Sequence, residues 1–317
     1  MSMELKTILF FSEQTVNNII CQLLNNLEML EIQSLWNPES LPETAFSPES
    51  TLIVAETAQG IQFAIKQRIP YIEKWENTLS DSQWKPVCYY DRLEALTCEY
   101  LENQWKRAHH LPLTICTSKR FYLQELSLAD FPKLYAIRQK EAITRFLPKL
   151  SSLEEELKKH KHYITCQYEF FDYGLWGVFK KDGTLIGQAG IQNTDYNGHT
   201  YLELAYFISP EYQQKGYATE AILAIYHFVV THLEENRILA IIAKNNLASI
   251  RTAMNLGMKP KEEVKHLGFD CHYYVLDNIK DFLSLYESEQ KRVNAAKSAL
   301  RNAIKRPVQE VYSRYRQ

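Results

Sequence analysis

The sequence predicts an α/β protein made of two modules and a C-terminal helix. Its 317 residues exceed the ~100–200 residues of a typical domain, so we expect two domains. The first third alternates apolar runs of strand length with helical periodicity, which is typical of a small parallel sheet. Nine of the ten glycines fall between 174 and 268, where we expect a turn-rich sheet and the functional site.

Composition excludes several classes of protein. Hydrophobic residues make up 45% and charged residues 23%, as in ordinary globular proteins, and the net charge of −2 provides no basic field for nucleic acid or a membrane surface. No apolar run approaches the ~18 residues of a membrane span. The six cysteines form no CxxC pair, and His199, His227 and His232 show no ligand spacing with carboxylates. We therefore expect a cytoplasmic protein without a metal site.

The N-terminal module is expected to cover residues 1–115. Three apolar runs predict strands, and they are KTILFF (6–11), TLIVA (51–55) and IPYI (69–72). Two stretches of helical periodicity lie between them, at 15–30 and 57–68, and predict helices. Pro38, Pro42 and Pro48 indicate a loop between the first helix and the second strand. Residues 91–108 are expected to be helical, and HHLPLTICT (109–117) to be a linker.

The stretch VAETAQGIQFAIKQRIPYI resembles the last conserved motif of haloacid dehalogenase-like hydrolases, an acidic turn followed by a glycine-containing helix and a strand. The family's Gly-Asp is replaced here by Ala55-Glu56, and no DxD motif lies near the first strand. Phosphoryl transfer by that route needs an aspartate nucleophile and carboxylates for magnesium. We therefore expect a degenerate, non-catalytic module used for packing or partner contact, with a phosphatase as the alternative.

The central domain is expected to cover residues 116–280. An amphipathic helix is predicted over 152–167, with Ser151 or Ser152 as N-cap. LWGVFKKDGTLIGQAGIQNTD predicts a hairpin that turns at Lys181-Asp182-Gly183, and HTYLELAYFISP predicts a third antiparallel strand.

A glycine-containing loop then opens a long helix in EYQQKGYATEAILAIYHFVVTHL. A strand followed by such a loop and a helix presents unpaired backbone N–H groups and the positive end of a helix dipole. That arrangement suits a pyrophosphate, and the small residues Gly216 and Ala218 allow its close approach. By itself this short pattern is also found at ordinary helix starts.

The next segments make the pattern more specific. RILAIIAK predicts a buried strand. NNLASIRTAMNLGMKP predicts a helix whose start is marked by Asn246 and Ser249 and whose end is marked by Gly257. Together with TSKRFYLQEL and ELAYFISPEYQQKGYATEA, this succession resembles the GNAT acetyltransferase superfamily over about 117–276, especially the branch of the RimJ- and RimL-like N-acetyltransferases. The resemblance implies an α+β fold whose mixed, mainly antiparallel sheet has splayed central strands.

The resemblance also implies acetyl-CoA as cosubstrate and an amine as acceptor. The pantetheine arm would pair with the main chain of Tyr206, Phe207 and Ile208, and Asn246 would contact the same arm. The backbone of one loop would hold the pyrophosphate, and its residues are Gln213, Gln214, Lys215, Gly216, Tyr217, Ala218 and Thr219.

Direct attack of an amine on the thioester needs a base and a proton for the leaving thiolate. Glu203 is the candidate base, directly or through water, and Ser249 the candidate proton donor. A carboxylate in an ion pair and a serine that only caps a helix are the alternatives. The tyrosine that many family members carry on the last helix is Ala253 here. A non-catalytic acyl-CoA sensor or scaffold remains an alternative function.

The tail, 281–317, predicts one long amphipathic helix. It carries eight Lys and Arg against four Asp and Glu, so its net charge is +4. Docking on the chain's own body, contact with RNA, and a homodimer through this helix or through the N-terminal module remain open.

Overall fold

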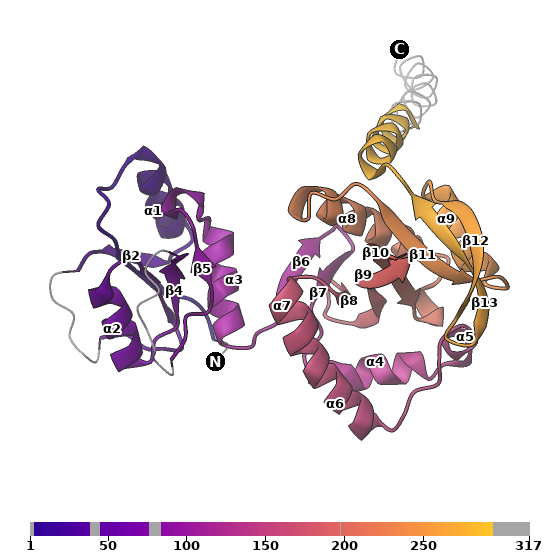
Figure 1. Cartoon of the computed structure of the whole chain (residues 1–317), viewed down its shortest axis with the longest axis horizontal. Helices are drawn as coiled ribbons and strands as arrows, with labels where there is room; N and C mark the ends of the chain where they lie inside the picture. The colour runs from indigo at the N-terminus through magenta and orange to yellow at the C-terminus, as the bar shows by residue number, and fades with distance from the viewer. Residues whose placement is uncertain (1–2, 39–44, 76–83, 197, 294–317) are drawn as a thin grey trace, which may run out of the picture. The chain divides into compact units, whose positions relative to one another are not determined.

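The computed structural model describes residues 3–38, 45–75, 84–196 and 198–293 (Figure 1). The chain divides between Leu113 and Thr114 into two compact units. The expected helical tail is helical over 279–293, and its remainder, 294–317, lies outside the described residues.

The first unit contains a five-stranded sheet in the order β2-β1-β3-β4-β5, and all of its strand pairs are parallel. The expected parallel sheet is therefore confirmed. The strands are β1 (Thr7–Phe11), β2 (Gln33–Trp36), β3 (Thr51–Ala55), β4 (Tyr71–Lys74) and β5 (Tyr89–Tyr90). The helices are α1 (Asn18–Met29), α2 (Ala58–Gln67), the 3₁₀ helix η2 (Leu93–Ala95) and α3 (Cys98–Ala108).

Helices cover both faces of this sheet. Ile8 and Phe10 of β1 pack with residues of α1 and α3, whereas Leu9 and Phe11 pack with residues of α2. A strand that is buried on both faces needs apolar residues at every position, which explains the continuous runs TILFF and TLIVA.

The second unit contains an eight-stranded sheet in the order β12-β13-β11-β10-β9-β8-β7-β6. Every neighbouring pair is antiparallel except β10 with β11, so the expected mixed, mainly antiparallel sheet is confirmed. The strands are β6 (Thr114–Thr117), β7 (Phe121–Gln124), β8 (Leu175–Lys180), β9 (Leu185–Tyr196), β10 (His199–Ile208), β11 (Ile238–Ala243), β12 (Lys259–His266) and β13 (Phe269–Leu276).

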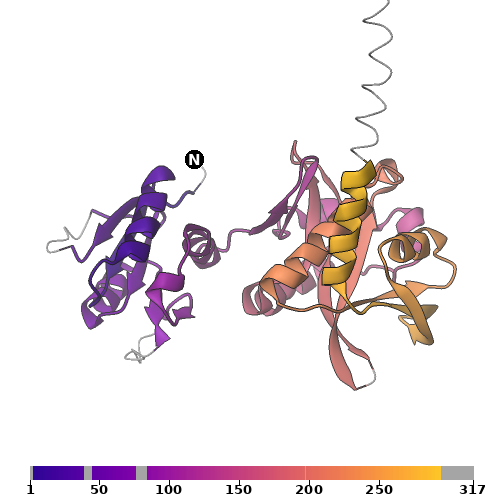
Figure 2. The same ribbon diagram turned by 90° about the horizontal axis from the view of Figure 1, so that it is seen from above.

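Helices also cover both faces of the second sheet (Figure 1). They are α4 (Phe131–Arg138), α5 (Glu141–Thr144), α6 (Leu153–Tyr163), the π-helix η3 (Ile164–Tyr168), α7 (Glu169–Phe171), the 3₁₀ helix η4 (Pro210–Tyr212), α8 (Tyr217–His232) and α9 (Leu247–Asn255). Leu204 of β10 packs with α8, whereas Phe207 packs on the side of α4 and α6. The helix over 279–293 lies beside α8, where the rings of Phe282 and Tyr226 are 5.9 Å apart (Figure 2).

Strands β8, β9 and β10 form the predicted meander. Gly183 occupies the turn of the first hairpin with φ of 81°, a conformation that glycine adopts without strain. Ser152 caps α6 by accepting the N–H of Glu155, as expected. The last turn of the predicted 152–167 helix is the π-helix η3 rather than regular α-helix.

The sequence did not predict two short strands. The stretch expected to be a linker contains strand β6, so that expectation is wrong, and strand β2 lies between α1 and the expected loop. Pro38 and Pro48 lie outside helices and strands, as expected, and residues 39–44 lie outside the described residues. Both strands have four residues and lie at an edge of their sheet. Such short edge strands are held by pairing with one neighbour, so their own sequence pattern carries little signal.

Gly190 of β9 provides a test of the packing in the meander. A Cβ atom added there would lie 2.0 Å from the carbonyl oxygen of Gly174, a backbone atom that cannot move aside cheaply. We expect Gly190→Ala to lower the free energy of unfolding by about 1–3 kcal/mol. Gly183→Asn is the control, because nothing lies within 4 Å and Asn tolerates a positive φ. Denaturant unfolding that gives equal stability for Gly190→Ala and the wild type would contradict this packing.

Candidate functional site

The centre of the second sheet opens between β10 and β11. Strand β10 pairs with β9 over its full length, from His199 to Ile208. Its register with β11 consists of one residue pair, Glu203 with Leu239. Beyond Glu203 the edge of β10 therefore faces a gap in the sheet, as expected for splayed central strands.

The direction of the backbone groups along this edge follows from one hydrogen bond. The N–H of Ser209 donates to the carbonyl of Ile186 at 2.7 Å, so the polar groups of Ser209 face β9. Because these groups alternate along a strand, those of Phe207 also face β9, and those of Tyr206 and Ile208 face the gap. The side-chain amide of Gln213 donates to the Ile208 carbonyl at 2.7 Å.

Two helix N-termini lie at the same end of the gap. Strands β10 and β11 are parallel, so their carboxyl ends point the same way. After β10 the chain enters α8 through η4 and the loop at 213–216, and after β11 it enters α9. The predicted cofactor residues thus come from two segments that the fold places around one opening.

The N-terminus of α8 has no side-chain cap. Its N-cap residue is Gly216, with φ of 82°, and no side chain accepts a hydrogen bond from the first turn. The N–H groups of Tyr217, Ala218 and Thr219 have no acceptor within the helix, since the first turn of any α-helix leaves them free. An anion at this position would satisfy them.

The preceding loop is tightly folded. Gln214 has a φ of 57°, and the backbone N–H of Gln213 donates to the carbonyl of Pro210 at 3.3 Å. The Lys215 ammonium group donates to the carbonyl of Glu211 at 2.8 Å, a neutral acceptor that leaves its positive charge at the loop. Of the seven predicted loop residues, Gln213 uses its N–H within the loop, whereas Gly216 begins the uncapped turn.

Helix α9 has the opposite arrangement at its start. Asn246 is its N-cap, and its side-chain oxygen accepts the N–H of Ser249 at 3.2 Å. The predicted helix start is therefore confirmed. Because the oxygen of Asn246 is used in the cap, only its NH₂ group remains as a donor toward the gap.

Glu203 lies at the point where β10 and β11 last pair. Its side chain is 6% exposed, and the side-chain amide of Gln192 donates to it at 3.2 Å. Burial raises the pKa of Glu203 above its ordinary value, although hydrogen bonds from Gln192 and Thr194 and the nearby His266 act in the opposite direction. A carboxylate with a raised pKa is a better proton acceptor near neutral pH.

Tyr206 connects β10 with α9. Its hydroxyl donates to the carbonyl of Ser249 at 3.5 Å, and burial raises its pKa. Since side chains alternate along a strand, Glu203 leaves β10 on the face opposite to Tyr206. Ser249 therefore lies on the face of the sheet that the Tyr206 side chain occupies, and Glu203 lies on the other face. Ala253 is buried in the core of the unit, so no phenol comes from that position of α9.

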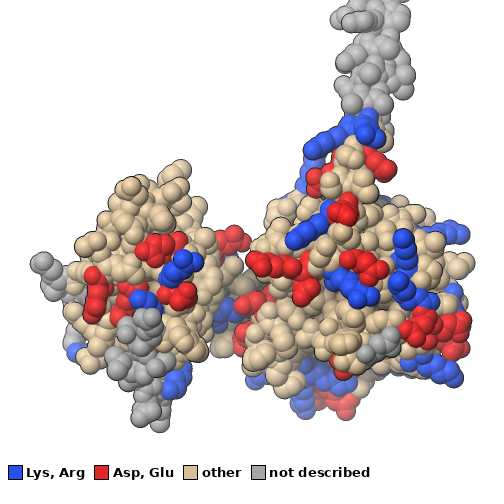
Figure 3. Space-filling model, turned by 45° about the horizontal axis from the view of Figure 1, so that its top comes forward, with Lys and Arg blue, Asp and Glu red and all other residues tan. Residues whose placement is uncertain are grey.

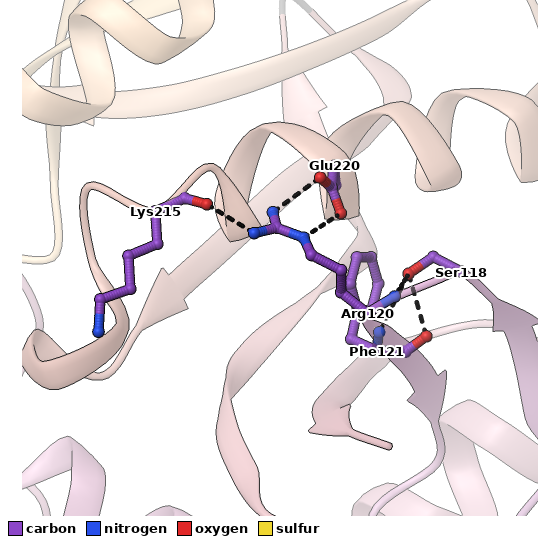
Figure 4. A network of polar contacts seen from close by, with 5 residues as sticks. All are labelled: Ser118, Arg120, Phe121, Lys215 and Glu220. Atoms are coloured by element: carbon purple, nitrogen blue, oxygen red, sulfur yellow. Dashed lines mark hydrogen bonds and ion pairs between the residues drawn. The ribbon is translucent and has the colours of Figure 1, made fainter.

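Sequence reasoning did not assign a role to Arg120. This residue directly precedes β7, about a hundred positions before the loop, yet its guanidinium contacts both Lys215 and Glu220 (Figure 4). Its position within TSKRFYLQEL was the available signal, but only the fold brings that segment to the N-terminus of α8.

In the first unit, the predicted acidic turn lies where β1 and β3 end. Glu56 accepts hydrogen bonds from the hydroxyl of Ser12 and from the side-chain amide of Gln14, the latter at 3.0 Å. The side chain of Asn37 makes two hydrogen bonds with the backbone of Ser12. Its NH₂ group donates to the carbonyl at 2.7 Å, and its oxygen accepts the N–H at 2.9 Å. Across the described part of the chain, no group of three or more His, Cys, Asp or Glu side chains could hold a metal ion.

These features stand beside three comparisons with known proteins. Residues 120–259 match the model of the acetyltransferase (GNAT) domain. Among curated proteins, the chain is 26% identical over 147 residues to the uncharacterized N-acetyltransferase YnaD of Bacillus subtilis, which covers 45% of this chain and 81% of YnaD. YoaA of the same organism, also called an uncharacterized N-acetyltransferase, is 26% identical over 149 residues, or 46% of this chain and 82% of YoaA.

Solved structures align with about half of the chain. An acetyltransferase from Agrobacterium tumefaciens aligns with 20% identity and a TM-score of 0.44, covering 51% of this chain and 92% of its own. RimL, described as a ribosomal L7/L12 alpha-N-protein acetyltransferase in complex with coenzyme A, aligns with 16% identity and a TM-score of 0.46, covering 53% of this chain and 99% of its own.

Two surface properties bear on other partners. Among the described residues, no helix has the length and apolar character needed to cross a bilayer. Lys and Arg side chains are interspersed with Asp and Glu over the face of the second unit seen in Figure 3. On that face no single sign of charge dominates.

Gly216 provides a direct test of the loop. A valine there would be strained by the positive φ, and its Cβ would lie 3.4 Å from the guanidinium of Arg120. We expect Gly216→Val to weaken acetyl-CoA binding at least tenfold in calorimetry, because the loop could no longer offer its N–H groups to phosphate. Gly183→Val is the control, because it has a similar φ of 81° in an open hairpin turn. Equal affinity in Gly216→Val and the wild type would refute the loop as the binding site.

The acidic turn of the first unit gives a second test. Ser12 stands at the end of β1 and is hydrogen-bonded to Glu56, so no aspartate nucleophile is available there. We expect the full chain to show no magnesium-dependent hydrolysis of an aryl phosphate. Hydrolysis that is lost in Glu56→Gln would show that the first unit is a phosphatase.

Proposed function

We propose that the second unit is an acetyl-CoA-dependent N-acetyltransferase that acts by direct attack of an amine on the thioester. The observation that carries the proposal is the gap between β10 and β11 with the uncapped N-terminus of α8 at its end. The match of residues 120–259 to the acetyltransferase domain supports acetyl transfer in general. The names of the two Bacillus subtilis relatives support nitrogen as the acceptor atom.

The residues around the gap fit the parts of acetyl-CoA. The N–H groups from Gly216 to Thr219 would hold the pyrophosphate, and Lys215 would add positive charge. The amides of the pantetheine arm would pair with Tyr206 and Ile208, whose backbone groups face the gap. Phe207 would contribute packing instead, since its backbone groups face β9. The NH₂ group of Asn246 would donate to the same arm.

The proton steps follow from the positions of Glu203 and Ser249. The attacking nitrogen forms a bond to the carbonyl carbon while the bond from carbon to sulphur breaks. Glu203 would take the proton that the amine loses, directly or through water, and Ser249 would give a proton to the departing thiolate. The two residues lie on opposite faces of the sheet, so each would act from its own side of the gap.

Three tyrosines near Glu203 would form the acceptor side of the site. Tyr196, Tyr201 and Tyr273 come from three strands, and their rings lie 4.4–5.8 Å apart. Tyr196 donates to Glu262 at 2.5 Å. The Tyr201 ring already packs against the guanidinium of Arg237 at 4.9 Å. The rings of Tyr196 and Tyr273 would therefore meet an amine that arrives as a cation, because ring faces attract positive charge. A protein N-terminus and a small amine both fit this chemistry.

A non-catalytic acyl-CoA sensor is the second candidate function. Ala253 in place of the family's tyrosine favours it, because a common proton donor is missing at that position. Release of free thiol from acetyl-CoA across a panel of small amines and peptides separates the two functions. Amine-dependent release supports the transferase. Tight binding without release from any amine supports the sensor.

Substitution of Glu203 tests its role as base. Glu203→Gln keeps the size of the side chain but removes a base, and we expect turnover to fall by about 10²–10⁴-fold with acetyl-CoA affinity unchanged. In the wild type, kcat/KM should rise with pH through a pKa above that of an ordinary carboxyl, because the deprotonated form acts. That ascending limb should be absent in Glu203→Gln. Full turnover and an unchanged pH profile in this variant would remove Glu203 from the mechanism.

Substitution of Ser249 tests the proton donor separately. The cap bond to Asn246 uses the backbone N–H of Ser249, so Ser249→Ala should leave the helix start intact, although its side chain also contacts Tyr206. We expect kcat to fall and acetyl-CoA affinity to stay the same, since the hydroxyl acts only as the thiolate leaves. Thr252→Ala, one turn further along α9, also removes a side-chain contact with Tyr206, so it is the control for the loss of that contact and should keep wild-type turnover. Equal kcat in Ser249→Ala and the wild type would assign the proton to water.

A further inference from the structure

We propose that Arg120 is a positioning residue that sets the orientation of the phosphate-binding loop and cancels the charge of Glu220 beside it. The inference rests on the proposed function, because it concerns the same acetyl-CoA site. It adds a residue from the segment before β7, which the sequence pattern of the loop does not indicate.

The guanidinium of Arg120 makes three hydrogen bonds with the start of α8 (Figure 4). Its Nη1 donates to the carbonyl of Lys215 at 2.9 Å, and its Nε and Nη2 donate to the two carboxylate oxygens of Glu220 at 3.1 and 2.7 Å. The same group lies 4.4 Å from the centre of the Tyr217 ring. One side chain therefore contacts the loop, the first residue of α8 and the first turn of α8.

Arg120 is itself held in place by the segment between β6 and β7. The hydroxyl oxygen of Ser118 accepts the backbone N–H of Arg120 at 3.2 Å and that of Phe121 at 3.1 Å. Phe121 is fully buried in the core of the second unit. The backbone that carries the guanidinium is thus held in place, so the hydrogen bond from the guanidinium can orient the glycine-containing loop.

The bond to Lys215 determines where the next N–H points. The peptide between Lys215 and Gly216 is trans, and in a trans peptide the C=O and the following N–H point in opposite directions. With the carbonyl of Lys215 turned toward Arg120, the N–H of Gly216 is turned away from it. Arg120 therefore selects the peptide orientation that offers this N–H together with the free N–H groups of the first turn.

The pair with Glu220 solves an electrostatic conflict. A carboxylate in the first turn stabilises a helix through its dipole, but it would repel a phosphate that binds at the same end. The bidentate guanidinium cancels that charge, so the helix keeps its acidic first turn and the site keeps its attraction for an anion.

The experiment compares donors with and without phosphates in the full chain. We expect Arg120→Ala to raise the KM for acetyl-CoA and the Kd for CoA about tenfold or more, the effect of losing charge-assisted hydrogen bonds, with kcat little changed. With S-acetylpantetheine as donor, which has no phosphates at the loop, kcat/KM should be the same as in the wild type. Arg120→Lys keeps the positive charge but loses the planar guanidinium, so its KM for acetyl-CoA should lie between those of the wild type and Arg120→Ala.

Arg237→Ala is the matched control. Arg237 also pairs with a carboxylate, Asp277 at 2.9 Å, and lies 4.9 Å from a tyrosine ring, that of Tyr201. The two pairs are similarly exposed, at 40% and 56% for Arg237 and Asp277 and 36% and 43% for Arg120 and Glu220. Arg237 precedes β11 and so lies at the end opposite to the loop, and its loss should leave CoA affinity unchanged.

Substitution of Glu220 distinguishes the two effects of Arg120, the orientation of the loop and the cancellation of the Glu220 charge. In Glu220→Gln the bond to Lys215 remains, and CoA should bind as tightly as in the wild type or more tightly. In the double variant Arg120→Gln/Glu220→Gln no charge is left unpaired, so this protein should fold even if Arg120→Ala does not, and it should still bind CoA more weakly than Glu220→Gln.

Three results would overturn the proposal. The first is wild-type affinity for CoA in Arg120→Ala. If Arg120→Ala does not fold, the corresponding result is an affinity of the double variant equal to that of Glu220→Gln. The second is an equal loss of kcat/KM with S-acetylpantetheine, which would indicate general damage. If the wild type itself binds no CoA, the proposed function fails and the role of Arg120 fails with it.

Discussion

The second unit depends on one pair of residues, Glu203 and Leu239, at which two parallel strands meet within an otherwise antiparallel sheet. Because the strands are parallel, both carboxyl ends point the same way and two helices begin side by side. Because the pairing stops there, the backbone groups of Tyr206 and Ile208 face a gap. The carbonyl of Ile208 accepts the side-chain amide of Gln213, whereas the amides of a bound ligand would pair with the backbone of Tyr206.

The uncapped start of α8 needs stability from elsewhere. Ala221, Ile222, Ile225 and Val229 are buried in the core, so packing along the helix fixes it although its first turn lacks a cap. In α9, by contrast, Asn246 supplies a side-chain cap. The two helices share the same end of the gap, but only α8 leaves its first N–H groups for an anion.

Local signals in the sequence predicted what local chemistry decides. Gly183 indicated the hairpin turn, Asn246 the start of α9 and Gly216 the loop, because each of these conformations depends on one residue type. Strand β6 and the position of Arg120 depend on partners far along the chain, which a periodic pattern does not encode. The sequence predicts that the backbones of all three residues 206–208 pair with the pantetheine arm. The register with β9 turns the backbone groups of Phe207 toward β9, and only the structure gives that register.

The two glutamates near the site show how surroundings assign different roles to one residue type. Glu220 is partly exposed and held by the guanidinium of Arg120, so its carboxylate is committed to an ion pair. Glu203 is buried, and its hydrogen bond from Gln192 comes from a neutral amide. Burial favours the protonated form of Glu203. A higher pKa makes a carboxylate a stronger base, so we propose proton transfer for Glu203, whereas Glu220 remains the ion-pair partner of Arg120.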